Sequence, residues 1–268
     1  MIEALPKPTQ SVFIAVKLLR AHPRLLLTRL VADALLTGLV LAARDAWDGF
    51  NWRVAVVAFA YVWLARCFVN AGFIGALAAQ WTSGQGRYFD IGLSRLLRAA
   101  NAQIATSAWV GLVVATQVVM GLVAWRADLA LGAFGGAIAT LCWISLSALQ
   151  AWFTLRLWLA GNASIVLDQP LADAHAQTGE VLALRHGEAR FAVTAWLALV
   201  LTALGELIVW MSWSLAATTD EGLITLLAPV LGAYVVALSQ ALAVVVLGCL
   251  RNVAPLGRAI VVSMPAME

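Results

Sequence analysis

The sequence predicts an all-α fold: a polytopic membrane protein with six transmembrane helices arranged in three helix pairs. Its composition is one basis, since 63% of the 268 residues are hydrophobic and 12% are charged, whereas soluble domains contain about 25% charged residues. Long uncharged runs are the other basis, because several reach the roughly 20 residues that a helix needs to cross a bilayer. Apolar sequence occurs throughout the chain, so we expect a single membrane domain over residues 1–268.

The first two expected spans, 25–43 and 54–76, carry charged residues within apolar sequence. At a rise of about 1.5 Å per residue, Arg66 lies about 20 Å from the charged outer end of its span, which leaves it about 10 Å inside a hydrocarbon core of about 30 Å. Asp33 has a compatible depth on the neighbouring helix, and Arg29 precedes it by one turn on the same face. Because a charge at the bilayer centre costs about 2.5 to 3.5 kcal/mol, we expect Arg29, Asp33 and Arg66 to form one cluster.

The middle two expected spans, 104–125 and 131–155, contain no charged residue. A short outer loop around Asp128 separates them. Arg156 follows the second of these spans, and the helical path from Asp128 to Arg156 is about 42 Å long, which exceeds the thickness of the hydrocarbon core. We therefore expect the long side chain of Arg156 to reach the inner membrane surface by snorkelling.

The last two expected spans, 191–213 and 223–250, contain one charged residue, Glu206. Its distance from the charges that flank its span places it near the middle of the membrane. Three outcomes are open for this side chain: an ion pair with Arg66, an ion pair with Arg156, or a neutral carboxyl group kept protonated by burial.

The distribution of Lys and Arg predicts the orientation of the chain. Most basic residues lie in loops on one side of the six spans, and cytoplasmic loops are the ones enriched in Lys and Arg. We therefore expect both termini in the cytoplasm and only short loops outside. The N-terminal sequence MIEALPKPTQ lacks the pattern of a cleaved signal peptide, and the expected location is the inner (plasma) membrane.

Each inner loop contains a short amphipathic segment that leads into a membrane helix. KLLRAHPRLLL at 17–27 resembles RLLRAANAQIA at 95–105, which resembles LALRHGEARFA at 182–192. Arg98 and Arg185 align between the last two segments at an offset of 87 residues. Such a repeat predicts three copies of one unit, in which a cytoplasmic interfacial helix precedes a helix pair. The three units cover about 9–81, 87–160 and 170–251.

The interfacial segments carry polar residues at helical spacing with mostly apolar residues between them. Two placements are open: along the inner membrane surface beside anionic lipid, or against the ends of the helix bundle. The third segment is the most acidic, with Asp173, Glu180 and Glu188. It is the possible docking surface for a basic partner or another subunit, although a charged run is commonly just solvated surface. The interfacial basic residues are Lys17, Arg20, Arg24, Arg95 and Arg98.

Two interpretations apply to the intramembrane charge cluster of Arg29, Asp33, Arg66 and Glu206. Ionisable residues inside a membrane are the usual sign of a solute, ion or proton pathway. The other interpretation is a polar clasp that fixes the order of the helices. Acid and base at matching depth favour the clasp, and the paired broken helices typical of transporters are not evident.

Sequence motifs typical of catalysis are missing. No HExxH, GxSxG or phosphate-loop motif occurs. The three cysteines lie in apolar helices and define no disulfide framework. We therefore expect no enzymatic activity, catalytic residue, cofactor or metal site. The net charge of +3 follows from membrane topology, so no nucleic-acid partner is expected.

The chain resembles a known family over most of its length. The resemblance rests on three segments that accompany the helix pairs: KLLRAHPRLLL, QWTSGQGRYFDIGLSRLLR and VLDQPLADAHAQTGEVLALRHG. With them the chain resembles a broad group of uncharacterised bacterial six-span membrane proteins. It is also similar to the membrane domain fused to some glycerophosphodiester phosphodiesterases. The phosphodiesterase part has no counterpart in this sequence, so its activity is not carried over, and the resemblance implies a membrane module with no settled biochemistry.

These observations predict a non-enzymatic integral membrane protein that acts as a scaffold or accessory subunit of a membrane complex. It would hold a protein partner, or further copies of itself, within the lipid bilayer. The alternative is a transporter or permease component for a small or lipid-like solute. In that case Asp33, Arg66 and Glu206 would line the pathway, because intramembrane ionisable residues mark such routes.

Overall fold

The structure, a computed structural model, describes residues 7–45, 52–83, 87–185, 189–216 and 222–251. Within these ranges every element of secondary structure is an α-helix, which confirms the all-α prediction. In chain order the helices are α1 (Pro8–Ala21), α2 (Pro23–Asp45), α3 (Trp52–Ser83), α4 (Tyr88–Ser94), α5 (Leu96–Leu167), α6 (Leu171–Arg185), α7 (Ala189–Ala216) and α8 (Gly222–Arg251).

In the described part of the chain, five helical segments are long and apolar enough to cross a membrane. The chain therefore has the character of a multi-pass membrane protein in its structure as well as in its composition. Helix α2, which contains the first expected span, is not among the five within the described part of the chain. The five segments are Ala60–Trp81, Leu96–Ala130, Gly132–Leu167, Ala192–Val209 and Leu227–Gly248.

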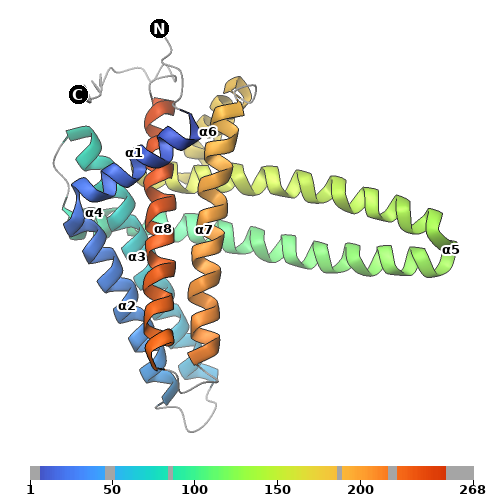
Figure 1. Ribbon diagram of the computed structural model, residues 1–268, viewed down its shortest axis with the longest axis horizontal. Coiled ribbons are helices and arrows are strands. Elements are labelled where there is room, and N and C mark those ends of the chain that lie inside the picture. The colour runs from blue at the N-terminus through green and yellow to red at the C-terminus, as the bar shows by residue number, and fades with distance from the viewer. Residues whose placement is uncertain (1–6, 46–51, 84–86, 186–188, 217–221, 252–268) are drawn as a thin grey trace.

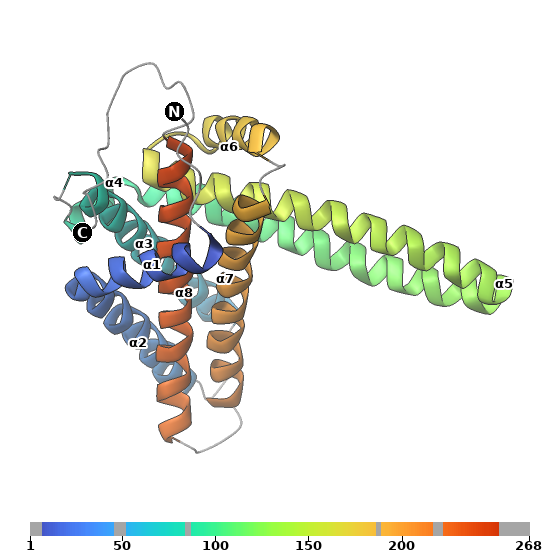
Figure 2. The ribbon, with the colours of Figure 1, turned by 45° about the horizontal axis from the view of Figure 1, so that its top comes forward.

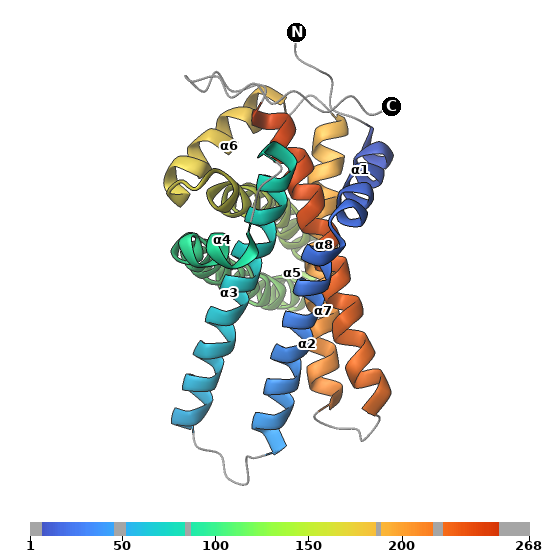
Figure 3. The same ribbon diagram turned by 90° about the vertical axis from the view of Figure 1, so that its left-hand side faces the viewer.

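Helices α2, α3, α7 and α8 run alongside one another as a bundle (Figures 1 and 3). The most extensive contact joins α7 to α8, and two glycines lie within it. A Cβ atom at Gly205 would lie 2.8 Å from the carbonyl oxygen of Gly232, and a Cβ at Gly232 would lie 2.8 Å from the carbonyl oxygen of Gly205. Small residues let helix backbones approach this closely in a membrane, so the crossing depends on glycine at both positions.

Helix α5 is a long hairpin whose two arms lie side by side and project away from the bundle, across the direction of its helices (Figures 1 and 2). Gly132 lies between the arms with φ 65° and ψ −164°, a conformation that is essentially restricted to glycine. The expected outer loop around 126–128 is helical instead. The arms are therefore longer than the predicted spans and are separated by a single non-helical residue.

A short helix precedes each pair of long helical segments. Helix α1 packs mainly against α8, α4 against α3, and α6 against α5. Pro8 begins α1, where its fixed φ suits the first turn, and the side chain of Gln10 accepts a hydrogen bond of 3.0 Å from the backbone N–H of Lys7. The segment 95–105, expected as an interfacial helix, instead leads directly into α5 from Leu96 onward.

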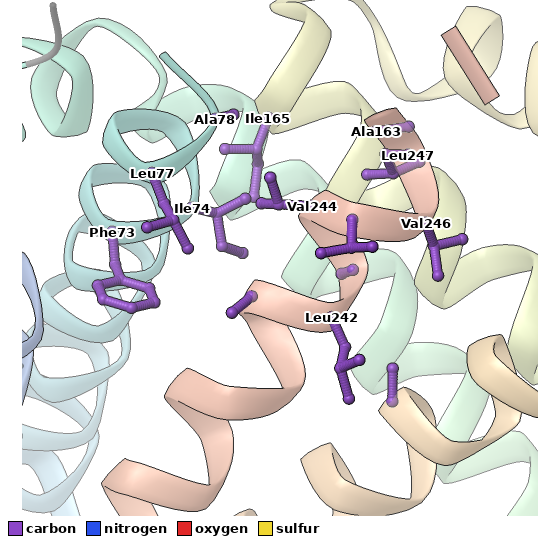
Figure 4. Packing of buried hydrophobic residues seen from close by; sticks show 14 of the residues in the cluster. Phe73, Ile74, Leu77, Ala78, Ala163, Ile165, Leu242, Val244, Val246 and Leu247 are labelled. Carbon is purple, nitrogen blue, oxygen red and sulfur yellow. The ribbon is translucent and has the colours of Figure 1, made fainter. Parts of the chain in front are cut away.

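The hydrophobic core lies where α3, α5 and α8 meet (Figure 4). Leu77 of α3, Leu159 of α5 and Leu242 of α8 are completely buried. Ile74 and Val244 point toward one another between α3 and α8 (Figure 4). This core joins the base of the α5 hairpin to the bundle, while most of the hairpin beyond it stays exposed.

Candidate functional site

A buried arginine is the centre of the candidate site. Arg29 lies on α2, and its side chain is 1% exposed. Its Nε donates a hydrogen bond of 2.6 Å to Oδ2 of Asp33, one helical turn later. Residues four apart share a helix face, and this part of the expected charge cluster is therefore confirmed as a contact. The acid also removes much of the cost of burying the guanidinium.

Two amide side chains from other helices add to the hydrogen bonding of Arg29. Its Nη1 donates to Oδ1 of Asn70 on α3 at 2.6 Å and to Oε1 of Gln240 on α8 at 3.2 Å. Nε2 of Gln240 also donates to Oδ1 of Asn70 at 3.0 Å. We call Arg29, Asp33, Asn70 and Gln240 the polar network. It connects α2, α3 and α8 through hydrogen bonds in the interior of the bundle.

Asn70 and Gln240 are site residues that a search for charges does not reveal. Each is a strongly polar residue inside an apolar run, Asn70 within CFVNAG and Gln240 within ALSQAL. That pattern is itself a usable signal, because an amide buried in an apolar environment also needs a hydrogen-bond partner. Amide side chains commonly make such bonds between membrane helices.

Tyr88 of α4 lies at the edge of the polar network. Its hydroxyl group donates a hydrogen bond of 3.1 Å to the backbone carbonyl of Val69 on α3. Burial raises the pKa of Tyr88 to about 12; the nearby positive charge of Arg29 lowers that pKa, and the negative charge of Asp33 raises it. The hydroxyl therefore stays neutral at physiological pH and fixes α4 against α3.

A second ion pair joins α3 to α7. Nη2 of Arg66 lies 2.9 Å from Oε1 and 2.7 Å from Oε2 of Glu206. The two side chains are 18% and 31% exposed, so this pair is less buried than the polar network. The expected contact of Arg66 with Asp33 is wrong, because Arg29 on the same helix neutralises Asp33 and Glu206 supplies the acid for Arg66. Among the outcomes open for Glu206, the pair with Arg66 is the one found.

Three of the interfacial basic residues, Lys17, Arg20 and Arg24, are exposed. Lys17 and Arg20 lie on α1, whose buried face, including Ala15 and Leu19, packs against the bundle. Helix α1 thus covers the bundle with one face and presents its basic side chains on the other. Helix α1 therefore combines the two placements considered for the interfacial segments: it packs against the bundle, and it exposes basic side chains that could face anionic lipid.

Arg95 and Arg98 contact the end of α5. Nη1 of Arg95 donates to the backbone carbonyls of Ile165 at 2.6 Å and Val166 at 3.2 Å, where a cation also complements the helix dipole. Burial lowers the pKa of Arg95, and the charge of Asp168 raises it. Nε of Arg98 lies 3.6 Å from Oδ1 of Asp168. Arg95 therefore binds within the chain, which differs from the exposed interfacial role expected for it.

The predicted docking surface is described only in part. Asp173 is exposed in the first turn of α6, where an acidic side chain complements the positive end of the helix dipole. The side chain of Glu180 and the whole of Glu188 lie outside the described part of the chain, so this surface stays a prediction. Among the described residues, no three His, Cys, Asp or Glu side chains form a group that could hold a metal ion.

Comparisons with protein-family models, curated proteins and solved structures found no match for this chain. The functional argument therefore rests on geometry. In the polar network Arg29 contacts Asp33 and both amides, and the two amides contact each other, so that three helices are joined. Such an arrangement satisfies its own hydrogen-bonding groups and connects helices, which is the property expected of a structural clasp.

Proposed function

We propose that the protein is a non-enzymatic integral membrane protein that acts as a scaffold or accessory subunit, with the α5 hairpin as its assembly arm. The single observation that carries the proposal is the exposure of that hairpin. Its arms are 35 and 36 residues long and apolar, and over an 18-residue stretch of each arm almost no side chain is buried by the rest of the chain. A surface of this kind is available to another protein inside the membrane.

The polar side chains of the hairpin bond between its own arms. Nε2 of Gln117 donates to Oγ of Ser147 at 3.0 Å and to Oε1 of Gln150 at 2.6 Å. Nearer the base, Nε1 of Trp109 donates to Oγ1 of Thr154 at 2.9 Å. Hydrogen bonds of this kind hold helices together in an apolar environment. The outer faces are left to aliphatic side chains, including Val118, Leu122, Leu141 and Ile144.

The length of the hairpin favours a protein partner. A single crossing of the hydrocarbon core needs about 20 residues, and each arm exceeds that number by more than half. The base of each arm lies in the hydrophobic core, and the exposed remainder is long enough to lie along the transmembrane helices of a partner. We therefore propose that the hairpin packs against the transmembrane helices of another membrane protein, using aliphatic ridges that fit between helices.

Six spans are part of this proposal, with α2 as the sixth. Both termini would lie in the cytoplasm of a bacterial cell, and the inner membrane would be the location. The order of one short helix followed by two long segments occurs three times in the chain, which supports the units 9–81, 87–160 and 170–251 as repeats. The excess of Lys and Arg in the proposed inner loops supports the orientation.

Site-specific photo-crosslinking in native membranes tests the assembly arm. A photoreactive amino acid is placed at Leu122 on the hairpin and, as the matched control, at Leu35 on α2, which is also an exposed leucine. We expect a crosslink of one defined size to a membrane protein from position 122 and lipid adducts alone from position 35. Co-expression of two differently tagged copies identifies a crosslink between copies of this chain. Lipid adducts alone at both positions would contradict the proposal.

A transporter or permease component is the second candidate. The partial exposure of Arg66 and Glu206 favours it, because an ion pair that is incompletely buried inside a membrane can exchange partners with a passing ion or solute. The two candidates differ in what they require of the charges. A clasp needs them for stability, whereas a pathway needs them for flux.

A further inference from the structure

Arg156 is a cation that neither the polar network nor the ion pair of Arg66 uses. It lies on the second arm of α5, beside α6. Its Nε is buried and has no hydrogen-bond partner among the described residues, while the side chain as a whole is only partly buried. A buried donor without a partner is energetically unfavourable. The guanidinium therefore has an unused capacity to bind an acceptor.

Gly179 of α6 provides the space that the Arg156 guanidinium occupies. A Cβ atom at position 179 would collide with Nη2 of Arg156, and it would lie 3.4 Å from Cζ. Any other residue at this position would move the arginine head group. Helix α6 packs along α5, so the backbone around Gly179 and the arginine together form a niche at the edge of the two helices.

Arg156 lies toward the base of the α5 hairpin, where α6 packs on α5. The place expected for it from the sequence is the inner membrane surface, which its long side chain would reach by snorkelling. Trp152 precedes Arg156 by one turn on the same face and is partly buried. Tryptophan is enriched at this interface.

We propose that Arg156, in the niche beside Gly179, binds a phosphate group, as carried by an anionic phospholipid headgroup. A guanidinium offers donors that match phosphate oxygens in a bidentate arrangement. The free phosphate ion has the same chemistry, and the two sources differ in whether an acyl chain contributes to binding. This site goes beyond the proposed scaffold function, because it requires no protein partner.

Binding measurements on the purified full-length protein in detergent test the site. The probes are short-chain phosphatidylglycerol and inorganic phosphate, and the readout is the apparent dissociation constant of each. We expect Arg156→Gln to weaken binding of phosphatidylglycerol about tenfold, in line with the loss of charge-assisted hydrogen bonds. Arg87→Gln removes an exposed cation and should bind as tightly as the wild type.

Gly179→Ala tests the niche while leaving the charge unchanged. The new Cβ should displace the guanidinium, which is the movable end of a flexible side chain, so the variant should fold and bind phosphatidylglycerol several-fold more weakly. Gly111→Ala, on the same hairpin with no atom within 4 Å of its new Cβ, is the matched control. Equal affinity in the wild type and in Arg156→Gln would overturn the proposal, and so would an equal loss in Arg87→Gln.

The two probes separate the sources of the phosphate group. Tighter binding of phosphatidylglycerol than of inorganic phosphate, lost in Arg156→Gln, supports a lipid site. Equal binding of both probes, again lost in Arg156→Gln, supports a site for free phosphate. Failure of both probes to bind the wild-type protein would show that the niche is not a phosphate site.

Discussion

At the scale of single residues, the interior of this protein is organised by the need to satisfy a buried cation. Arg29 is neutralised by Asp33 and receives two further acceptors from Asn70 and Gln240. A buried ion pair is a weak source of net stability, because desolvation offsets much of its attraction, yet removal of one partner leaves an uncompensated charge. The network therefore specifies which helices meet more than it strengthens their contact.

Arg29→Met should lower the free energy of unfolding by about 3–5 kcal/mol, because Asp33 would be left as a buried carboxylate without its cation. The double variant with Asp33→Leu should recover much of that loss. Denaturant unfolding in mixed micelles measures both changes. Arg20→Met, which removes an exposed cation from α1, should alter stability by less than about 0.5 kcal/mol. Unchanged stability in Arg29→Met would argue against a clasp and for a pathway.

At the scale of helices, the closest contacts occur where a glycine leaves the backbone without a side chain. Helix α7 crosses α8 at Gly205 and Gly232, and helix α4 lies against α3 where a Cβ at Gly72 would come 2.9 Å from the carbonyl oxygen of Tyr88. Without a hydrophobic driving force between helices in lipid, close packing of this kind is a principal source of their association.

Gly205→Ala should destabilise the protein by about 1–3 kcal/mol, since overpacking forces the backbone to move. The new Cβ would lie 2.8 Å from the carbonyl oxygen of Gly232 and 3.0 Å from the backbone nitrogen of Val236. Gly248→Ala on α8 meets no atom within 4 Å and should instead stabilise its helix by up to about 1 kcal/mol. Thermal unfolding in detergent measures both variants, and a change of the same sign in the two would contradict this account of the crossing.

The existence of the long helices was largely predictable from the sequence, whereas the residues at which they begin and end were less so. Apolar runs located all the long helices, but the expected loop around 126–128 proved to be helical up to the break at Gly132. Charged residues suggested a loop there because they favour water. A helix of sufficient length carries such residues beyond the hydrocarbon core without unwinding. The charged residues therefore predicted a loop several residues before the break at Gly132.

At the scale of the whole molecule, two bodies share one core. The bundle of α2, α3, α7 and α8 runs in one direction, and the α5 hairpin projects across it (Figures 1 and 2). The base of the hairpin is held by the hydrophobic core and by the contact of Arg95 with the end of α5. The outer part of the hairpin projects beyond the bundle and exposes many large apolar side chains to other molecules.

Reporter fusions test the proposed topology of the whole chain. Alkaline phosphatase inserted at Asp128 in the hairpin tip should be active, because its disulfides form only outside the cytoplasm. Green fluorescent protein at the C-terminus should fluoresce, as expected for a cytoplasmic end. An inactive phosphatase at the tip in a stably inserted protein would show that the hairpin does not cross the membrane.

The sequence by itself determined the class of protein and the position of its long helices, because hydropathy is a local property and a membrane demands it over about 20 consecutive residues. It also identified the charges that need partners. Only the tertiary structure decided which partners they have: Arg66 binds Glu206, and Asn70 and Gln240 join Arg29. The direction of the hairpin was likewise a tertiary outcome. Such contacts depend on how each helix is rotated and which helices are neighbours, and neither property is encoded in any single apolar run.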